Sequence, residues 1–227
     1  VGEKFNGHDF ISEAFQRGAG LALVQEDLSA RFPTLDLSQA AFSRWGQAGF
    51  LDHFVEVLAG LDPAASFCLR ADDSLAALQN VAGYWRSKLN LRVVGITGSV
   101  GKSTSKELIA SVLNQRYRTL KNHGNLNNEV GLPLTLLSLN EKHERAVLEM
   151  GFYVPGEIAF LCNIAQPSIG IVTNVGTVHA ERAGSQEAIA RGKSELVQAL
   201  PSDGVAILNF DDSWVRKMEE KSKARVF

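Results

Sequence analysis

Residues 93–104 have the sequence Val93-Val-Gly-Ile-Thr-Gly-Ser-Val-Gly-Lys-Ser-Thr104, and this stretch decides the fold. The β-branched, apolar run that ends at Thr97 predicts a buried strand. A glycine-bounded turn, Gly98-Ser-Val-Gly101, follows, and Lys102-Ser-Thr104 opens a helix. A glycine-rich turn between a strand and a helix is typical of a P-loop, in which backbone N–H groups surround phosphate oxygens.

The residues of this loop have the chemistry that a triphosphate requires. The helix N-terminus carries partial positive charge, Lys102 neutralises the outer phosphates, and the Ser103 hydroxyl is suited to Mg²⁺. The longer P-loop pattern has a glycine where this chain has Ile96, so only the short form G-x-x-G-K-S is met. The alternative is a tight strand-to-helix turn with a chance lysine. If the loop is a P-loop, ATP with Mg²⁺ contacts Gly98, Ser99, Val100, Gly101, Lys102, Ser103 and Thr104.

Strands and helices alternate along the chain from about residue 91. Helical patterns separate the apolar runs, and the runs read as strands that are buried on both faces. This alternation predicts an α/β fold, a parallel sheet flanked by helices. The expected strands are 92–97, 146–150, 168–173 and 204–208, and the expected helices are 103–115, 155–164 and 185–200.

The first 90 residues predict a smaller, partial α/β domain. A helix capped by Asp73-Ser74 leads directly into the P-loop strand, so we place the domain boundary near Asn90. The predicted domains are therefore 1–90 and 91–227. Residues 26–65 have no role that the sequence assigns. The expected elements of the smaller domain are helices at 9–17 and 75–89 and strands at 21–24 and 66–69.

The overall composition is that of an ordinary globular protein. Of 227 residues, 45% are apolar and 21% are charged, and the net charge is −2. This balance argues against nucleic acid as a partner, and no apolar run approaches the roughly 20 residues that a membrane span needs. Two cysteines, Cys68 and Cys162, are too few for a disulfide framework. We therefore expect a reducing, cytoplasmic location.

Two residues follow predicted strands at the sheet edge where parallel sheets bind ligands. Glu149 lies at the end of the run 146–150, where a carboxylate can hold Mg²⁺. The alternative is a surface carboxylate on an edge strand. His179 follows the strand at 168–173 and can ligate a metal, orient a phosphate or transfer a proton. A capping or surface histidine is an equally open interpretation.

Several asparagines lie close to these candidates in the sequence. Asn125 and Asn128 belong to a glycine-bounded loop whose amides can bond phosphate oxygens or substrate carbonyls. A plain turn is at least as good an interpretation, because asparagine tolerates the left-handed conformation. Asn174 follows the strand at 168–173, again at a carboxyl end.

Lys193 is the least expected residue of the chain. Helical spacing places it on an apolar stripe, where a lysine usually extends to reach water. The alternative is a partly buried lysine with a lowered pKa. A neutral amine of that kind can take up CO₂ as a carbamate and become an anionic metal ligand. The other members of the stripe are Ile189, Leu196, Val197 and Leu200.

These motifs, in this order, resemble those of the Mur ligases. The resemblance is most specific over residues 91–209, and the stretch after the P-loop is similar to that of the members that add D-alanyl-D-alanine. The N-terminal Glu3-Lys-Phe-Asn-Gly-His-Asp-Phe10 resembles the end of the family's nucleotide-sugar-binding domain. The motifs are Gly95-Ile-Thr-Gly-Ser-Val-Gly-Lys-Ser-Thr104, Gly124-Asn-Leu-Asn-Asn-Glu-Val-Gly-Leu-Pro-Leu-Thr-Leu-Leu137, Leu148-Glu-Met-Gly151, Thr173-Asn-Val-Gly-Thr-Val-His-Ala-Glu181 and Ala190-Arg-Gly-Lys-Ser-Glu195.

The resemblance implies an ATP-binding central domain at 91–227 and, at 1–90, part of a domain that binds UDP-N-acetylmuramoyl (UDP-MurNAc) substrate. ATP would phosphorylate the terminal carboxylate of UDP-MurNAc-tripeptide, and the amine of D-Ala-D-Ala would displace the phosphate. This reaction belongs to peptidoglycan precursor synthesis, and thus to cell-wall formation and division. The implied partners are these two substrates, and we expect a monomer.

The resemblance also implies residue roles. Lys102, His179 and Lys193 are the implied catalytic residues. Ser103, Glu149, His179 and a carbamylated Lys193 are the implied ligands of two Mg²⁺ ions. Facing the phosphates or the substrate are Asn125, Asn128 and Asn174.

The chain also departs from the family pattern. It lacks an N-terminal segment, the tail of the central domain with its adenine contacts, and the whole C-terminal domain, so we expect it to be truncated at both ends and inactive alone. Three alternatives stay open: another amide ligase of the superfamily, such as a folylpolyglutamate synthetase or a different amino-acid-adding Mur ligase; a non-catalytic nucleotide-binding module; and a P-loop NTPase. The sequence does not specify whether the third peptide residue is diaminopimelate or lysine.

Overall fold

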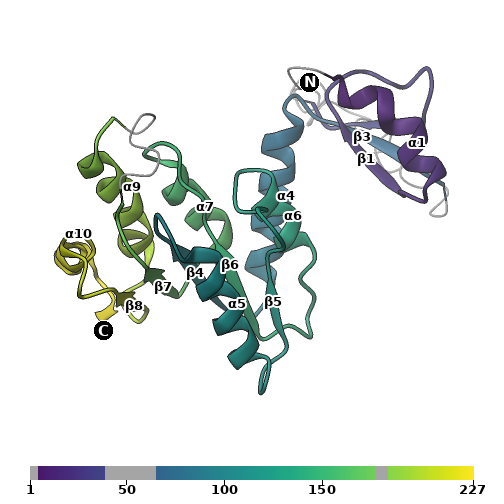
Figure 1. Ribbon diagram of the computed structural model, residues 1–227. Coiled ribbons are helices and arrows are strands. Elements are labelled where there is room, and N and C mark those ends of the chain that lie inside the picture. The colour runs from purple at the N-terminus through teal and green to yellow at the C-terminus, as the bar shows by residue number, and fades with distance from the viewer. Residues whose placement is uncertain (1–4, 39–64, 177–183) are drawn as a thin grey trace, which may run out of the picture. The chain divides into compact units, whose positions relative to one another are not determined.

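The computed structural model describes residues 5–38, 65–176 and 184–227 (Figure 1). Contacts divide the chain into two units, Val1–Leu78 and Gln79–Phe227. The division lies inside helix α4 (Ser74–Lys88), because Ala82 in its C-terminal half belongs to the core of the larger unit. The sequence placed the boundary after this helix, near Asn90. The roles assigned to the two domains stay predictions.

The smaller unit contains a three-stranded parallel sheet with the order β1-β3-β2. The predicted strands are confirmed as β1 (Leu21–Val24) and β3 (Phe67–Arg70). The predicted helix at 9–17 is a short 3₁₀ turn, η1 (Gly7–Phe10), continued by α1 (Ile11–Gln16). Strand β2 (Thr34–Asp36) lies in the stretch 26–65, for which the sequence predicts no role and most of which is outside the described residues.

The larger unit contains a six-stranded parallel sheet, so the predicted fold class is confirmed. The P-loop strand β4 lies between β6 and β7 and pairs with both. Its carboxyl end is therefore flanked by the carboxyl ends of two other strands. In spatial order the strands are β5 (Thr119–Lys121), β6 (Arg145–Glu149), β4 (Arg92–Thr97), β7 (Ile169–Val172), β8 (Val205–Leu208) and β9 (Arg225–Val226).

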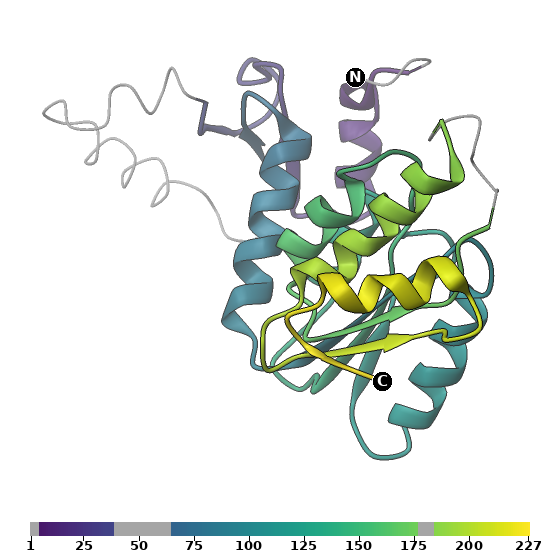
Figure 2. The same ribbon diagram turned by 90° about the vertical axis from the view of Figure 1, so that its left-hand side faces the viewer.

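Helices cover both faces of this sheet. Helix α5 (Lys102–Leu113) packs on one face, and α6 (Gly131–Leu137), α7 (Glu157–Ala165) and α9 (Gln186–Ala199) lie on the other (Figure 2). Short elements α10 (Ser213–Arg216) and η2 (Lys217–Lys221) pack near α9. Within the described ranges, none of the helices has the length and apolar character needed to cross a membrane.

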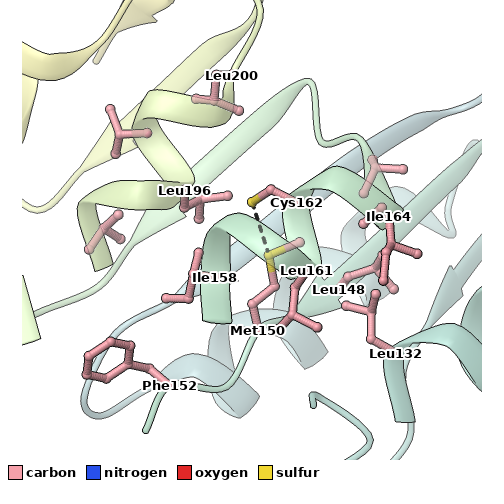
Figure 3. Close-up of a cluster of buried hydrophobic side chains, with 14 of the residues drawn as sticks. Leu132, Leu148, Met150, Phe152, Ile158, Leu161, Cys162, Ile164, Leu196 and Leu200 are labelled. Carbon is pink, nitrogen blue, oxygen red and sulfur yellow. Dashed lines mark hydrogen bonds between the residues drawn. The ribbon is translucent and has the colours of Figure 1, made fainter. Parts of the chain in front are cut away.

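Strand β4 is buried on both faces, as its continuous apolar run predicts. Val94 and Ile96 point into a small core under α5, whereas Val93 belongs to the larger core on the opposite face. Figure 3 shows part of that larger core, in which the Cys162 thiol lies 3.8 Å from the Met150 sulfur.

Two strand glycines bring α9 close to the sheet. A Cβ atom at Gly95 would lie 2.9 Å from the Leu196 Cδ1 atom, and one at Gly170 would lie 3.1 Å from both Leu196 and Leu200. Real Cβ atoms essentially never come as close as the first of these distances. The helix that carries Lys193 therefore rests on backbone rather than on side chains at these two positions.

Arg86 ties the end of α4 to the end of α7. Its buried guanidinium donates hydrogen bonds to the carbonyl oxygens of Ala165 (3.0 Å), Leu89 (3.1 Å), Leu91 (3.2 Å) and Gln166 (3.4 Å). Burial lowers the pKa of this guanidinium from its usual value. These carbonyls lie at or just after the C-terminal ends of α4 and α7, where regular helical bonding stops, so the arginine replaces the missing donors.

We expect Arg86→Met to lower the free energy of unfolding by about 3 kcal/mol or more, because each buried carbonyl left without a donor costs roughly 1–3 kcal/mol. Urea denaturation followed by tryptophan fluorescence measures this loss. Arg116→Met is the matched control, since Arg116 is exposed and its guanidinium lies over the Tyr117 ring. It should change stability by less than about 0.5 kcal/mol. Equal stability of the two variants would contradict the role given to Arg86.

Candidate functional site

The P-loop joins the end of β4 to the start of α5. Gly98 and Gly101 have φ angles of +149° and +86°, which L side chains rarely adopt. A Cβ atom at Gly98 would also lie 1.9 Å from the Thr173 Oγ1 atom. Gly101 is the N-cap of α5, so the open amides of a twelve-residue helix begin at this turn.

Asn174 holds the tip of this loop. Its Oδ1 atom accepts hydrogen bonds from the backbone N–H groups of Ser99 (3.1 Å) and Val100 (2.9 Å). Its Nδ2 atom donates to the Val100 carbonyl (3.0 Å), and the Thr173 hydroxyl donates to the same oxygen (2.7 Å). The structure thus places Asn174 against the P-loop backbone, and its predicted contact with nucleotide stays a prediction.

Lys102 curls back over the loop that precedes it. Its Nζ atom donates to the carbonyl oxygen of Gly98 at 2.8 Å. Burial lowers the pKa of this lysine, and the nearby Glu149 carboxylate opposes that shift. The ammonium group therefore lies at the mouth of the P-loop, where a phosphate can replace the carbonyl as its partner.

Glu149 ends β6 beside the P-loop and is only 4% exposed. Its Oε2 atom accepts from the Ser103 hydroxyl (2.7 Å), and its Oε1 atom accepts from Asn127 Nδ2 (2.9 Å). Its backbone N–H donates to the Asn122 side chain (2.9 Å). Because β6 lies inside the sheet, Glu149 is not a surface carboxylate on an edge strand.

The asparagines that hold Glu149 are not those selected from the sequence. Asn128 accepts a hydrogen bond from the Gly131 N–H (2.9 Å) at the start of α6, and Asn125 is exposed. Asn122 and Asn127 make the contacts to Glu149 instead. A fully buried asparagine such as Asn122 has no signal in a single sequence, since its partners come from a distant strand. The phosphate contacts of Asn125 and Asn128 stay predictions.

Lys106 is a second lysine at this site that the sequence analysis missed. It lies one helical turn after Lys102 on α5 and is 2% exposed. Its Nζ atom is 3.7 Å from Glu149 Oε2 and 3.4 Å from the Gly124 carbonyl oxygen. The clue in the sequence was its position four residues after the P-loop lysine.

Lys193 is buried on α9, with an exposed fraction of 2%. Burial first, and the positive charge of Lys102 second, lower its pKa to about 7. Its Nζ atom lies 4.9 Å from the centre of the Phe152 ring. Of the two interpretations of Lys193, the structure supports the buried lysine with a lowered pKa.

Two further predicted residues have no described contact at this site. His179 lies outside the described residues, and its metal and catalytic roles stay predictions. Thr104 is exposed on the first turn of α5.

The described site is well suited to a polyanion. Lys102 and Lys106 lie near the buried carboxylate of Glu149, and Lys193 lies close enough to Lys102 to feel its charge. Across the described ranges, three or more His, Cys, Asp or Glu side chains nowhere gather as a ready-made metal site. One carboxylate and one hydroxyl, those of Glu149 and Ser103, fit Mg²⁺, which usually keeps waters and takes its remaining ligands from substrate phosphates.

A parallel sheet with a P-loop at the carboxyl end of an inner strand defines the class of P-loop α/β domains, whose loop amides and lysine bind phosphate. Residues 96–227, more than half of the chain, match the Mur ligase middle domain, and the chain belongs to this family.

Individual relatives extend this similarity. The UDP-N-acetylmuramoyl-tripeptide–D-alanyl-D-alanine ligase of Synechocystis sp. is 39% identical over 220 residues, 97% of this chain and 42% of the relative. MurF from Acinetobacter baumannii superposes with a TM-score of 0.76 at 30% identity, covering 100% of this chain and 43% of that one. The MurF ligase from Thermotoga maritima in complex with ADP superposes with a TM-score of 0.75 at 29% identity, and the match covers 100% of this chain and 45% of that one. The chain spans less than half the length of these relatives.

The lowered pKa of Lys193 has a defined effect on stability. Below pH 7 both the folded and the unfolded chain carry the charge, so the folded chain bears the full cost of a buried ammonium. Between about pH 7 and 10.4 the unfolded chain binds more protons, and stability rises with pH. Lys193→Met should therefore be more stable than the unsubstituted chain at pH 6.5, on the order of 3 kcal/mol, and this difference should vanish near pH 10.

Urea denaturation at a series of pH values in CO₂-free buffer measures this difference. Lys217→Met serves as control, because Lys217 is exposed beside the Trp214 ring. A Lys193→Met difference that stays constant from pH 6.5 to 10 would show that the amine is not perturbed.

Proposed function

We propose that this chain is the part of an ATP-dependent ligase that binds nucleotide and activates a carboxylate. The acceptor is UDP-MurNAc-tripeptide, and the incoming amine is D-Ala-D-Ala. The observation that carries this proposal is the juxtaposition of the P-loop residues Lys102 and Ser103 with the held carboxylate of Glu149. That juxtaposition occurs in a chain 39% identical to a ligase named for these two substrates.

The proposed ligation has two steps, phosphorylation of the carboxylate and formation of the amide bond. A carboxylate oxygen of the tripeptide attacks the γ-phosphorus of ATP, and ADP leaves. The amine nitrogen then attacks the carbonyl carbon of the acyl phosphate, loses a proton, and phosphate leaves. The first step brings two anions together, so neutralisation and positioning provide most of the catalysis.

The residues of this chain divide that work. Lys102 binds the outer phosphates as it moves from the Gly98 carbonyl, and the amides at the start of α5 orient the chain of phosphates. Ser103 and Glu149 would hold one Mg²⁺, and Lys193 as a carbamate would hold a second with His179. Bound Mg²⁺ supplies charge neutralisation between the carboxylate and the γ-phosphate.

The surroundings of Lys193 support its carbamylation. An amine with a pKa of about 7 is largely neutral at pH 7.5, and only the neutral amine attacks CO₂. The nitrogen forms a bond to carbon and releases a proton, giving one negative charge. That charge is favourable here, because Lys102 lowers the pKa of Lys193 through its own positive charge.

The remaining features of the proposal follow from the family. Residues 1–90 belong to the domain that binds the UDP-MurNAc portion of the substrate. The enzyme acts as a monomer in the cytoplasm, on a step of peptidoglycan precursor synthesis. Residues 1–227 span less than half the length of the relatives, so the activity is proposed for the full-length protein.

Phosphate release by the full-length protein tests this function. We expect release from ATP to require UDP-MurNAc-tripeptide and D-Ala-D-Ala together, and to fall at least 100-fold when either is omitted. Glu149→Gln should reduce the rate by a similar factor, since it loses the charge that holds Mg²⁺. Release that ignores both substrates would instead indicate a P-loop NTPase, and nucleotide binding without release would indicate a non-catalytic module.

Carbamylation of Lys193 is tested by chemical rescue. Lys193→Ala should lose at least 100-fold in rate, and a short carboxylic acid such as acetate should restore part of it by replacing the carbamate. The same acid should not rescue Lys102→Ala, which removes a lysine that acts as a cation. Full activity of Lys193→Ala without any additive would contradict the carbamate role.

A further inference from the structure

Lys106 is the one buried charge at this site to which the proposed chemistry gives no task. It emerges from α5 beneath the P-loop, and its side chain is 2% exposed. A lysine this deeply buried cannot extend to water, so its charge must be balanced inside the protein.

Glu149 provides that balance. The Lys106 Nζ atom lies 3.7 Å from Glu149 Oε2, and both side chains are at most 5% exposed. Glu107 is at a similar distance from Nζ, 3.8 Å, but it is half exposed and pairs with Lys121. The buried partner of Lys106 is therefore Glu149.

Lys106 and Mg²⁺ consequently compete for the same oxygen. Glu149 Oε2 is the atom that accepts from Ser103, and thus the oxygen next to the hydroxyl proposed to bind the metal. The other oxygen is occupied by Asn127 Nδ2. A bare divalent cation arriving here would meet the charge of Lys106 at one carboxylate, with Lys102 close by.

A nucleotide changes this balance. The triphosphate adds several negative charges and several oxygen ligands to a site where Lys102 and Lys106 both lie near the buried carboxylate of Glu149. The repulsion between Lys106 and the metal is then compensated by phosphate.

We propose that Lys106 is a built-in competitor of the divalent cation, which keeps the Glu149 site free of metal until the triphosphate brings the metal with it. This proposal rests on the placement of Mg²⁺ at Glu149 in the proposed function. In that role Lys106 is a positioning residue that touches neither substrate nor metal. It neutralises Glu149 while the site is empty and makes binding of metal and nucleotide interdependent.

Binding of Mn²⁺ to the full-length protein without nucleotide tests this proposal, with free Mn²⁺ followed by electron paramagnetic resonance. Lys106→Met keeps the length of the side chain and removes its charge, so it should bind Mn²⁺ at least tenfold more tightly than the unsubstituted protein. Lys106→Arg keeps the charge and should bind no more tightly. Lys121→Met removes an equal charge from the other side of Glu107 and should also leave the affinity unchanged.

A second readout separates this role from a merely structural one. Because coupling between two ligands is reciprocal, ADP should raise the Mn²⁺ affinity of the unsubstituted protein several-fold more than that of Lys106→Met. A Lys106 that only stabilised the fold would leave this ratio unchanged. Lys106→Gln provides a second neutral variant if Lys106→Met does not fold, as judged by circular dichroism.

Two results would overturn the proposal. One is a neutral variant that binds Mn²⁺ no more tightly than the unsubstituted protein. The other is a gain in affinity that survives Glu149→Gln in the Lys106→Met background, because the metal would then lie elsewhere. Mn²⁺ binding is measured without the tripeptide or D-Ala-D-Ala. The proposed ligase function can therefore fail while this inference holds, and this inference can fail while the ligase function holds.

Discussion

The hydrogen bonds that join the ends of β4, β6 and β7 fix the relative positions of the P-loop, Glu149 and Asn174. The Thr97 carbonyl accepts from the Thr173 N–H (3.0 Å), and the Thr97 hydroxyl donates to the Met150 carbonyl (3.2 Å). The Ser99 hydroxyl accepts from the Gly176 N–H (2.9 Å). Three chain segments that are far apart in the sequence thus form one rigid edge. The P-loop, Glu149 and Asn174 are extensions of that edge, and a shift in one strand would displace all of them.

Burial of charge is the second constraint on this site. The cost of burying each lysine is offset differently. Carbonyl oxygens bond to Lys102, the Glu149 carboxylate pairs with Lys106, and Lys193 loses its proton near pH 7. None of these arrangements is the most stable way to fill a core, since apolar residues of similar volume often serve stability as well or better. The site therefore gives up stability for an electrostatic field that is already in place before an anion arrives.

Local pattern was enough to predict most of the fold. The runs at 92–97, 168–173 and 204–208 are β4, β7 and β8 to within one residue at either end, because their apolar residues are continuous and turn residues bound them. Strand β5 is only three residues long, and α6 follows directly on a polar loop, so neither has a periodic signal of its own. Strand β9 consists of two residues that pair with β8, too few to carry a periodic signal.

The candidate site was predictable where its residues are marked by the local sequence pattern. The P-loop has a motif, Glu149 ends a strand, and Lys193 interrupts an apolar stripe, so each stands out within a few residues of sequence. Asn122 and Asn127 do not stand out, because only the folded chain brings their partner Glu149 near. Lys106 has one local clue, its spacing of four residues from Lys102, but its contact with Glu149 is likewise made only by the folded chain.

The two glycines beneath α9 have a consequence for the chemistry of the amine above them. Gly95 and Gly170 have no functional group, yet the volume that they leave empty decides how deeply α9 settles on the sheet. That depth sets how far Lys193 is from water and from Lys102, the two influences that lower its pKa. The acidity of the amine thus depends in part on side-chain atoms that these two glycines lack, at positions far in sequence from Lys193.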